Sequence, residues 1–393
     1  MMRHLTIAMA GVMLLALVGA AMAEEAAPQV LVGDRGLQDR TIGPGAPAHT
    51  VGLKGVEHLM TLDTGARQFG LRYVVARDPK DEAAAIPGEG YIGMPEPTAA
   101  NWYHGGFFQL VINGEDIGRT FAHSVTGRSL GNRGYVDFVF DTRQAVVRVR
   151  FVGKAGDDAL YCQALLEPKQ EIKSLKLVLR CYPSAFISDG ERHVMTPVRD
   201  LKQGEKAELD LANEEWLLYY DSLYDAGYTS AHGTAAGPCS ALFPGSQASK
   251  CGFTVASYGI DTVFELKPML RDFRFVFFDY AGTKNAEAQA DLRRRAQGLL
   301  QELVTFQFTD PSLAGWDLQQ KQEEVRKALA LVPDDKEAAA KYQGWGEQLA
   351  AQLDLIKTGK AGAIMGEAEA ATIIGEWERG LPELKLKALL NEI

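Results

Sequence analysis

Alternating apolar and polar residues fill the middle of this chain, from about residue 51 to residue 280, and this pattern restricts the fold more than any other feature. Alternation with a period of two places every second side chain on the same face of a β-strand. Gly, Pro, Asn and Asp interrupt the pattern at short intervals, as expected for turns, and no helical pattern separates the strands. We therefore expect a mainly β protein: a large antiparallel β-sandwich followed by a C-terminal α-helical region.

The clearest hairpin is expected in the segment RGYVDFVFDTRQAVVRVRF. The residues that share its inward face are Val136, Phe138, Phe140, Ala145, Val147 and Val149. A turn at residues 141–144 is expected to join the two strands. This register places Asp137 opposite Arg148 on the outer face, where opposite charges stabilise a strand pair.

The first 23 residues have the pattern of a secretory signal peptide. Arg3 precedes an apolar run that ends in Ala21, Met22 and Ala23, with alanine at both positions that a signal peptidase reads. We expect cleavage after Ala23 and a periplasmic or secreted protein. A membrane anchor is the alternative, but the run is short for a bilayer span and a cleavage site closes it. No later segment is apolar for long enough to cross a membrane, so no transmembrane anchor is expected after cleavage.

The chain contains four cysteines, which are Cys162, Cys181, Cys239 and Cys251. An even number of cysteines in an exported protein predicts two disulfides. If the strands that contain Cys162 and Cys181 are antiparallel neighbours, one register sets these two residues opposite each other, with every inward residue facing another. A Cys239–Cys251 bond would then close a loop rich in Gly, Ser and Pro. Buried thiols that pack as small hydrophobic groups are the alternative.

The pattern changes near residue 283, where apolar residues recur at helical spacing. One helix is expected before the break at Asp310 and Pro311, and a helical hairpin with its turn at residues 333–335 is expected after it. This turn resembles a junction between tetratricopeptide units, but a solenoid needs about three repeats. A further helix is expected over residues 367–377, and Pro382 is expected to begin a short tail helix.

These patterns divide the chain into a signal peptide at residues 1–23, a β-sandwich domain at residues 24–282 and a helical region at residues 283–393. The helices either cover an edge or a face of the sandwich or bind a protein partner. The apolar residues Leu299 and Leu303 favour the first alternative, because they need an apolar surface to pack on.

The stretch NWYHGGFF contains the first candidate for ligand binding. Trp102 and Tyr103 offer flat apolar faces with a polar edge, and such faces stack on the C–H side of a sugar ring. His104 could donate or accept a proton near neutral pH. The alternative is that these aromatic residues fill one end of the sandwich core.

A second candidate lies in the stretch EEWLLYYDSLYDAGY. Trp216 and Tyr220 share one face of the expected strand, and Asp221 is a candidate acceptor for the hydroxyl groups of a ligand. The alternative is a carboxylate that tyrosine hydroxyls already satisfy.

Candidates for acid–base catalysis are His104, His193 and Glu265. A histidine and a carboxylate brought together from different strands could act as acid and base on a sugar. The chain contains no GxSxG, phosphate-binding loop, HExxH or EF-hand sequence, and its cysteines lack CxxC spacing, so we expect no cofactor and no metal ion. The formal net charge of −10 also argues against nucleic acid as a partner.

Residues 51–280 resemble the galactose-mutarotase-like β-supersandwich in three respects: a long series of antiparallel strands, a WYHGGF aromatic entry and a hairpin that ends LEPKQEIKSLKLVLRCYPS. The resemblance implies carbohydrate recognition on a concave sheet face. The catalytic histidines and glutamate of the mutarotases cannot be matched to positions in this chain, so the resemblance implies a fold and a ligand class but no enzymatic activity.

Together, these features predict an exported carbohydrate-binding or carbohydrate-associated β-sandwich protein. One alternative is a sugar-active enzyme, such as an epimerase, lyase or glycosidase, that uses a His–carboxylate pair. Another is a structural or assembly protein of the cell envelope that contacts its partner through the C-terminal helices.

Overall fold

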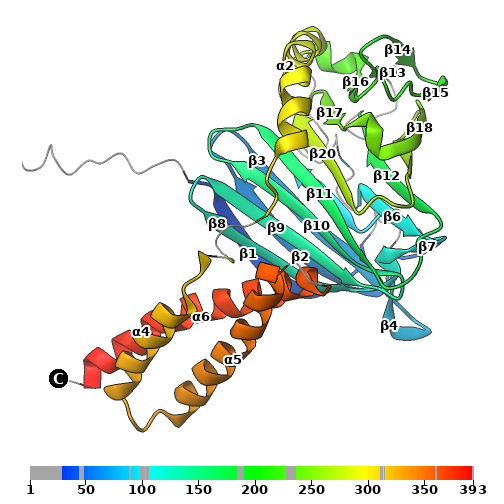
Figure 1. Ribbon diagram of the computed structural model, residues 1–393. Helices are drawn as coiled ribbons and strands as arrows, with labels where there is room; N and C mark the ends of the chain where they lie inside the picture. Colours follow the sequence, from blue (N-terminus) through cyan, green and yellow to red (C-terminus); the bar gives the residue numbers. More distant parts are fainter. Residues whose placement is uncertain are drawn as a thin grey trace, which may run out of the picture.

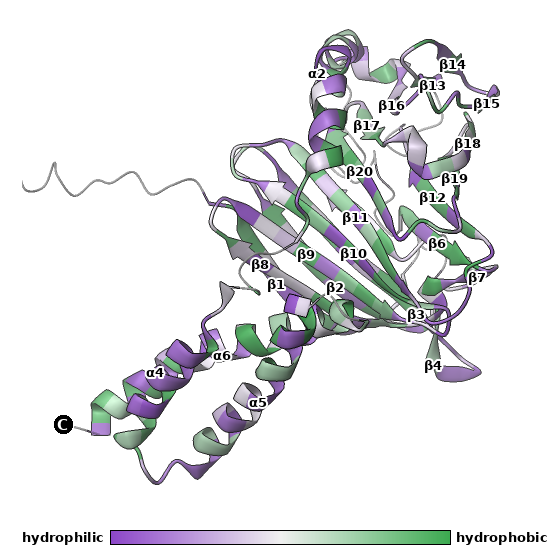
Figure 2. Ribbon diagram, viewed as in Figure 1, coloured by the Kyte–Doolittle hydropathy of each residue, from purple (hydrophilic) through white to green (hydrophobic). Residues whose placement is uncertain are grey.

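A computed structural model describes residues 29–43, 48–87, 90–97, 102, 106–183, 190–226, 236–309, 313, 315–358 and 361–391. Two large antiparallel sheets pack face to face, and the C-terminal part of the chain is helical (Figure 1). The predicted fold class is therefore confirmed. The hydropathy colouring in Figure 2 shows hydrophobic and hydrophilic residues alternating along the strands, as the sequence pattern predicts.

The first sheet has eleven strands, which are β1 (Leu31–Thr41), β2 (Lys54–Asp63), β3 (Gln68–Asp78), β4 (Asp81–Ile86), β5 (Ile92–Glu96), β6 (Phe108–Ile112), β7 (Glu115–Asp116), β12 (Leu175–Cys181), β15 (Lys206–Glu208), β18 (Ala248–Thr254) and β19 (Ile260–Leu266). The order of the strands is β1-β2-β3-β5-β6-β12-β19-β18-β15, with β4 beside β3 and β7 beside β6.

The second sheet has nine strands, which are β8 (Ala122–Leu130), β9 (Arg133–Asp141), β10 (Ala145–Lys154), β11 (Ala159–Pro168), β13 (Arg192–Met195), β14 (Asp200–Lys202), β16 (Trp216–Asp221), β17 (Cys239–Leu242) and β20 (Asp272–Asp279). Their order is β14-β13-β16-β17-β20-β11-β10-β9-β8. The helices are α2 (Asn285–Thr305), α4 (Leu318–Ala330), α5 (Lys336–Thr358) and α6 (Ala363–Asn391), and short 3-10 turns are η1 (Ile117–Arg119), η2 (Ser222–Ala226) and η3 (Gly245–Gln247).

The predicted hairpin exists as β9 and β10, but its register differs by two residues from the prediction. The last pair is Asp141 with Val146, so the turn lies one residue later than expected and Asp137 faces Arg150 rather than Arg148. The outer face of this hairpin is also buried: Arg150 is 0% exposed and Arg148 is 3% exposed. The alternation predicted the inward face correctly, because both registers keep the same residues pointing into the core.

The predicted disulfides do not form, because the four cysteines lie on strands that do not pair as expected. Cys162 belongs to β11, which pairs with β10 and β20, whereas Cys181 belongs to β12 in the other sheet. Cys239 and Cys251 likewise lie in different sheets, on β17 and β18. All four are buried thiols, in agreement with the alternative that the cysteines pack as small hydrophobic groups.

Helix α2 covers the outer face of the nine-stranded sheet (Figure 1). Its buried face includes Leu292, Leu299 and Leu303. These residues share an apolar cluster with Leu218 of β16 and Phe278 of β20. This helix therefore completes a second apolar layer of the sandwich and is not a separate unit.

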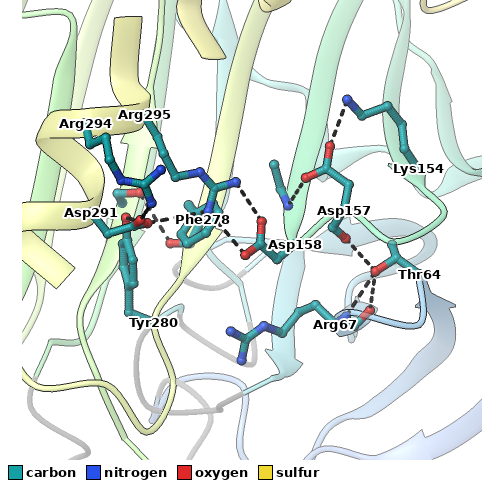
Figure 3. Close-up of polar contacts among 12 residues, drawn as sticks. Thr64, Arg67, Lys154, Asp157, Asp158, Phe278, Tyr280, Asp291, Arg294 and Arg295 are labelled. Atoms are coloured by element: carbon teal, nitrogen blue, oxygen red, sulfur yellow. Dashed lines mark hydrogen bonds and ion pairs between the residues drawn. The ribbon is translucent and has the colours of Figure 1, made fainter. Parts of the chain in front are cut away.

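Polar contacts fix α2 at the rim of this sheet (Figure 3). Arg295 forms an ion pair with Asp158 at 2.7 Å, and its guanidinium group lies 4.2 Å from the centre of the Phe278 ring. The hydroxyl of Tyr280 donates a hydrogen bond to Asp291 at 3.1 Å. The helix is thus held by charge–charge, cation–π and hydrogen-bond contacts as well as by apolar packing.

Helices α4, α5 and α6 form a bundle that extends away from the sandwich (Figure 1). Trp377 is buried at the centre of its apolar core. The first turns of α6 lie instead on the sandwich, where Ile364 and Ala368 pack against Val139 and Val146. A single helix therefore belongs to both the sandwich and the bundle. Among the helices of the described residues, none combines the length and apolar character needed to cross a membrane.

The tail helix expected to begin at Pro382 is part of α6, which runs without interruption from Ala363 to Asn391. A proline inside a helix removes one backbone hydrogen bond. Leu381, Leu384 and Ala388 are buried on both sides of the proline, so apolar packing offsets that loss.

Candidate functional site

Trp102, the first predicted ligand-binding residue, lies in the core of the sandwich. Its side chain is 0% exposed. Its ring packs edge-on against Phe277, with the ring centres 4.6 Å apart, and also contacts Phe107 and Tyr219. Of the two predicted alternatives for Trp102, the structure therefore shows core packing. Tyr103 and His104 lie outside the described residues.

The strand β16 places Trp216 and Tyr220 on the same face, as predicted. This is the outer face of the sheet, and the strand ends at Asp221. Asp221 is fully buried, and its carboxylate oxygen Oδ2 lies 3.6 Å from Nε of Arg192. Its other oxygen accepts a hydrogen bond from the backbone N–H of Leu223 at 2.9 Å. Burial raises the pKa of Asp221 above its ordinary value, although Leu223 and Arg192 act in the opposite direction. This carboxylate faces the interior and not the surface that carries Trp216.

His193 lies beside Tyr220 on the outer face, between two carboxylates. Its Nδ1 is 3.3 Å from Asp200, and its Nε2 is 3.3 Å from Glu191. The imidazole stacks on the ring of Tyr220 with their centres 4.8 Å apart. The Tyr220 hydroxyl donates a hydrogen bond to Asp200 at 2.6 Å. Burial, and to a lesser extent this hydrogen bond, raise the pKa of Tyr220. The structure thus brings a histidine, a tyrosine and two carboxylates together at the edge of the sheet.

Glu265 does not join this cluster. It lies on β19 in the other sheet, where its register neighbours are Lys176 and Lys250. His193 and Glu265 were predicted as partners from residue type alone, and the topology assigns them to different sheets. Asp200 takes the place of Glu265 and comes from the next strand along the chain, β14, which pairs with β13.

A hollow of about 480 Å³ lies between α2 and the start of β16, and Trp216 lines it. Polar side chains surround the indole: Asn213, Glu215, Arg293, Gln297 and Gln301. The guanidinium group of Arg293 lies 5.7 Å from the centre of the indole ring. Trp216 is only 6% exposed, so the hollow combines the small accessible part of one indole with amide, carboxylate and guanidinium groups, which is the composition of a site for a polar ligand with an apolar face.

Another hollow contains a His–carboxylate pair that the sequence did not reveal. Oδ1 of Asp34 lies 2.6 Å from Nε2 of His58, and both residues line a hollow of about 500 Å³ beside α6. They come from β1 and β2, where a register shift between Asp34 and Leu37 marks a β-bulge. A bulge changes the direction in which a side chain points. Asp34 and His58 are 24 positions apart in the sequence, and this spacing does not indicate the bulge.

Within the described residues, no group of three His, Cys, Asp or Glu side chains is placed to hold a metal ion. The side chains of the candidate sites offer hydrogen bonding, ion pairing, aromatic stacking and proton transfer by histidine.

Comparison with known proteins gives no family for this chain. No family model matches it, and no curated protein matches it. Among solved structures, the galactosidase domain of alpha-galactosidase-sucrose kinase shares 10% sequence identity with a TM-score of 0.34, over 57% of this chain and 40% of that chain. A Paenibacillus xanthan lyase shares 12% identity with a TM-score of 0.37, over 63% and 27%. Alpha-N-acetylgalactosaminidase NagBb from Bifidobacterium bifidum, in a GalNAc complex, shares 11% identity with a TM-score of 0.33, over 66% and 39%.

These structural likenesses are too low to establish a common fold or a common activity. The chain also spans less than half of the length of each of these three structures. The function must therefore be argued from the residues of this chain.

Proposed function

We propose that this protein binds carbohydrate and holds a saccharide ring in the hollow of Trp216. The single observation that carries the proposal is the indole of Trp216 lying among side-chain amides and a guanidinium group at the edge of α2. We also propose that the chain is exported and that its signal peptide is cleaved after Ala23, in line with the N-terminal sequence pattern.

The chemistry of a pyranose ring matches that of the hollow. One face of the ring presents C–H groups, which pack well on an indole, while hydroxyls project around its edge. Gln297 and Gln301 on α2 and Asn213 before β16 supply both donors and acceptors for such hydroxyls. A volume of about 480 Å³ is within the range of about 300–1,000 Å³ that is typical of small-molecule sites.

The walls of the hollow are held in place before a ligand arrives. Glu302 of α2 accepts hydrogen bonds from Lys154 at 2.5 Å and from the hydroxyl of Tyr161 at 2.7 Å. On the other side, the carboxylate of Glu215 accepts the backbone N–H of Gly245 at 2.7 Å. A site on fixed elements loses less conformational entropy on binding than a site on mobile loops does.

The proposal is tested by glycan-array and polysaccharide pull-down assays on the native protein, Trp216→Ala and Gln297→Ala. We expect the native protein to retain glycans and both variants to bind about tenfold more weakly or worse, as for residues at the centre of a binding site. Gln343→Ala is the matched control, because Gln343 is an exposed glutamine of α5 that lies far from the hollow in sequence and structure. No glycan retained by the native protein, or equal retention by both variants, would reject the proposal.

A catalytic role for His193 is the second candidate function. His193 stacks on Tyr220, which is on the same face of β16 as Trp216, and two carboxylates flank its imidazole. A histidine held between carboxylates can transfer a proton to or from a sugar hydroxyl. If glycans bind, their products are analysed by chromatography with the native protein and with His193→Gln. Turnover that His193→Gln abolishes, while glycan binding is retained, distinguishes an enzyme from a binding protein.

A further inference from the structure

The hollow that contains Asp34 and His58 is the wide part of a longer groove between β8 and α6. A second hollow of about 340 Å³ adjoins it. The residues that line both hollows are Thr126, Gly127, Ala371, Gly375 and Arg379. Because these residues are shared, the two hollows form one groove. We call it the α6 groove; its lining shares no residue with the hollow of Trp216.

Small residues of α6 keep the groove open. Ala371, Thr372 and Gly375 lie on the side of the helix that faces β8. A Cβ atom built on Gly375 would meet no other atom within 4 Å. The space above Gly375 is therefore empty and is not filled by packed side chains. A larger residue at this position would enter the groove without a clash with the backbone.

Groups that recognise hydroxyls lie in the wide part of the groove. The carboxylate of Asp34 is 48% exposed and orients the imidazole of His58, whose side chain is only 9% exposed. Ser124 lines the same space, and its hydroxyl oxygen is buried just behind this lining, without a hydrogen-bond partner among the described residues. A buried polar atom without a hydrogen-bond partner destabilises the protein, and a hydrogen bond to a ligand hydroxyl would remove that cost.

The charged groups of the wide part favour an anion. Two arginines, Arg77 and Arg379, line it together with one carboxylate, Asp34, and that carboxylate already contacts His58. Arg77 forms an ion pair with Asp39 at 3.3 Å, and Arg379 forms one with Glu376 at 2.5 Å. The Asp39 side chain is 86% exposed and the Arg379 side chain is 72% exposed, so water screens both pairs. In this wide part, guanidinium groups outnumber carboxylates although the formal net charge of the chain is −10.

We propose that the α6 groove binds a small hydroxylated anion, a molecule that carries one carboxylate or phosphate group and several hydroxyls. Uronic acids and sugar phosphates have this chemistry. The anionic group contacts Arg77 or Arg379, since guanidinium binds carboxylate and phosphate oxygens in pairs. The hydroxyls contact Asp34, His58 and Ser124.

The proposal is tested by isothermal titration calorimetry of the native protein with glucuronate, glucose 6-phosphate, glucose and inorganic phosphate. We expect glucuronate, glucose 6-phosphate or both to bind about tenfold or more tightly than neutral glucose does. Glucuronate alone indicates a carboxylate ligand, and glucose 6-phosphate alone indicates a phosphate ligand. Binding of inorganic phosphate as tightly as glucose 6-phosphate would overturn the hydroxyl part of the proposal.

Gly375→Leu is the blocking variant, because its side chain fills the open space of the groove and leucine favours the helix more than glycine does. Gly344→Leu on α5 is the matched control, since a Cβ at Gly344 also meets no atom within 4 Å and Gly344 does not line the groove. We expect Gly375→Leu and Arg379→Ala to weaken anion binding about tenfold or more, and Gly344→Leu to leave it unchanged.

Two outcomes would overturn the proposal: no measurable anion binding by the native protein, or anion binding that Gly375→Leu and Arg379→Ala leave intact. Trp216→Ala tests whether this site is distinct from the saccharide hollow, because removal of the indole should leave anion binding in the α6 groove unaffected. The saccharide proposal and the anion proposal can therefore be rejected independently of each other.

Discussion

Arg150 donates two parallel hydrogen bonds to the carboxylate of Asp137, each 2.6 Å long, across the β9–β10 pair in the interior of the protein. Its remaining donors reach beyond the sheet. Arg150 bonds Glu367 of α6 at 2.9 Å and the backbone carbonyl of Phe308 at 2.8 Å. One strand residue thus connects the sandwich to the linker after α2 and to the last helix. The sequence alternation predicts this face as the outer face of the hairpin.

We expect Asp137→Ala to reduce the free energy of unfolding by about 3–5 kcal/mol, because removing one partner leaves a buried guanidinium charge without its main counter-charge. Urea unfolding followed by circular dichroism measures this loss. Asp39→Ala is the control, since Asp39 is also a carboxylate paired with an arginine but is exposed, and we expect its loss to cost less than about 1 kcal/mol. Equal effects of the two substitutions would contradict a buried, structural pair.

The same pair predicts how stability depends on pH. Burial alone would raise the pKa of Asp137, but the charge and hydrogen bonds of Arg150 outweigh burial and lower that pKa below its ordinary value. A carboxyl group with a lowered pKa in the folded state contributes stability that is fully present above its unfolded pKa of about 3.9 and is lost as pH falls towards the folded value. We therefore expect the free energy of unfolding to decrease below about pH 4.

Urea unfolding at a series of pH values from neutral to acid checks this expectation. Glu57 and Glu302 also have lowered pKa values, in each case because arginine or lysine contacts outweigh burial, so they act in the same direction. Between neutral and acid pH, the free energy of unfolding should decrease less for Asp137→Asn than for the native protein. A native protein that became more stable on acidification would refute the direction of these pKa shifts.

Trp102 provides a test of core packing against ligand binding. We expect Trp102→Ala to destabilise the protein by about 3–5 kcal/mol, the range for large buried aromatic residues replaced by alanine. Its ring fills a space bounded by Phe107, Tyr219 and Phe277, and no solvent reaches it. Urea unfolding measures the effect, and a loss below about 1 kcal/mol would contradict the core assignment.

Local patterns were sufficient to predict the strands and their inward faces, but not which strands are neighbours. The β9–β10 hairpin could be predicted because a short turn joins its strands. Cys162 and Cys181 were expected on adjacent strands, yet β12 crosses to the other sheet and pairs with β6 and β19. The inward residues of β6, β11 and β19 are apolar except for Thr262 of β19, so alternation alone cannot distinguish among these strands as partners of β12.

The candidate sites show the same limit. Trp216, Tyr220 and His193 were singled out by residue type, and the structure places them on one face because β13 and β16 pair. Asp34 and His58 could not be predicted as a pair, because the β-bulge that turns them together leaves no mark in the spacing of the residues. The alternation of β9 and β10 predicts an outer face, but nothing in these strands shows that α6 covers it.

Two truncated chains test whether the helices belong to the sandwich. A chain that ends at residue 282 lacks α2 and exposes the apolar layer around Leu218 and Phe278. A chain that ends at residue 309 keeps α2 but loses the bundle, its contact with Val139 and Val146 and the hydrogen bond between Arg150 and Glu367. We expect the shorter chain to be insoluble or to bind a hydrophobic dye, and the longer chain to unfold cooperatively at a lower temperature than the full protein. A soluble, cooperatively unfolding chain ending at residue 282 would show that α2 is dispensable for the fold.

The cysteines provide the last prediction, because the structure replaces two expected disulfides with four buried thiols. Burial raises the pKa of Cys162 and Cys251, and a thiol with a raised pKa forms little of the reactive thiolate. We therefore expect a thiol reagent to label none of the four residues in the native protein and all four after unfolding. Cys181 and Cys239 are neighbours, with their sulfur atoms 3.3 Å apart between the two sheets. If only two thiols react after unfolding without reductant, the four-thiol state is wrong, and mass spectrometry of the peptides should then identify a Cys181–Cys239 bond rather than either pairing expected from the sequence.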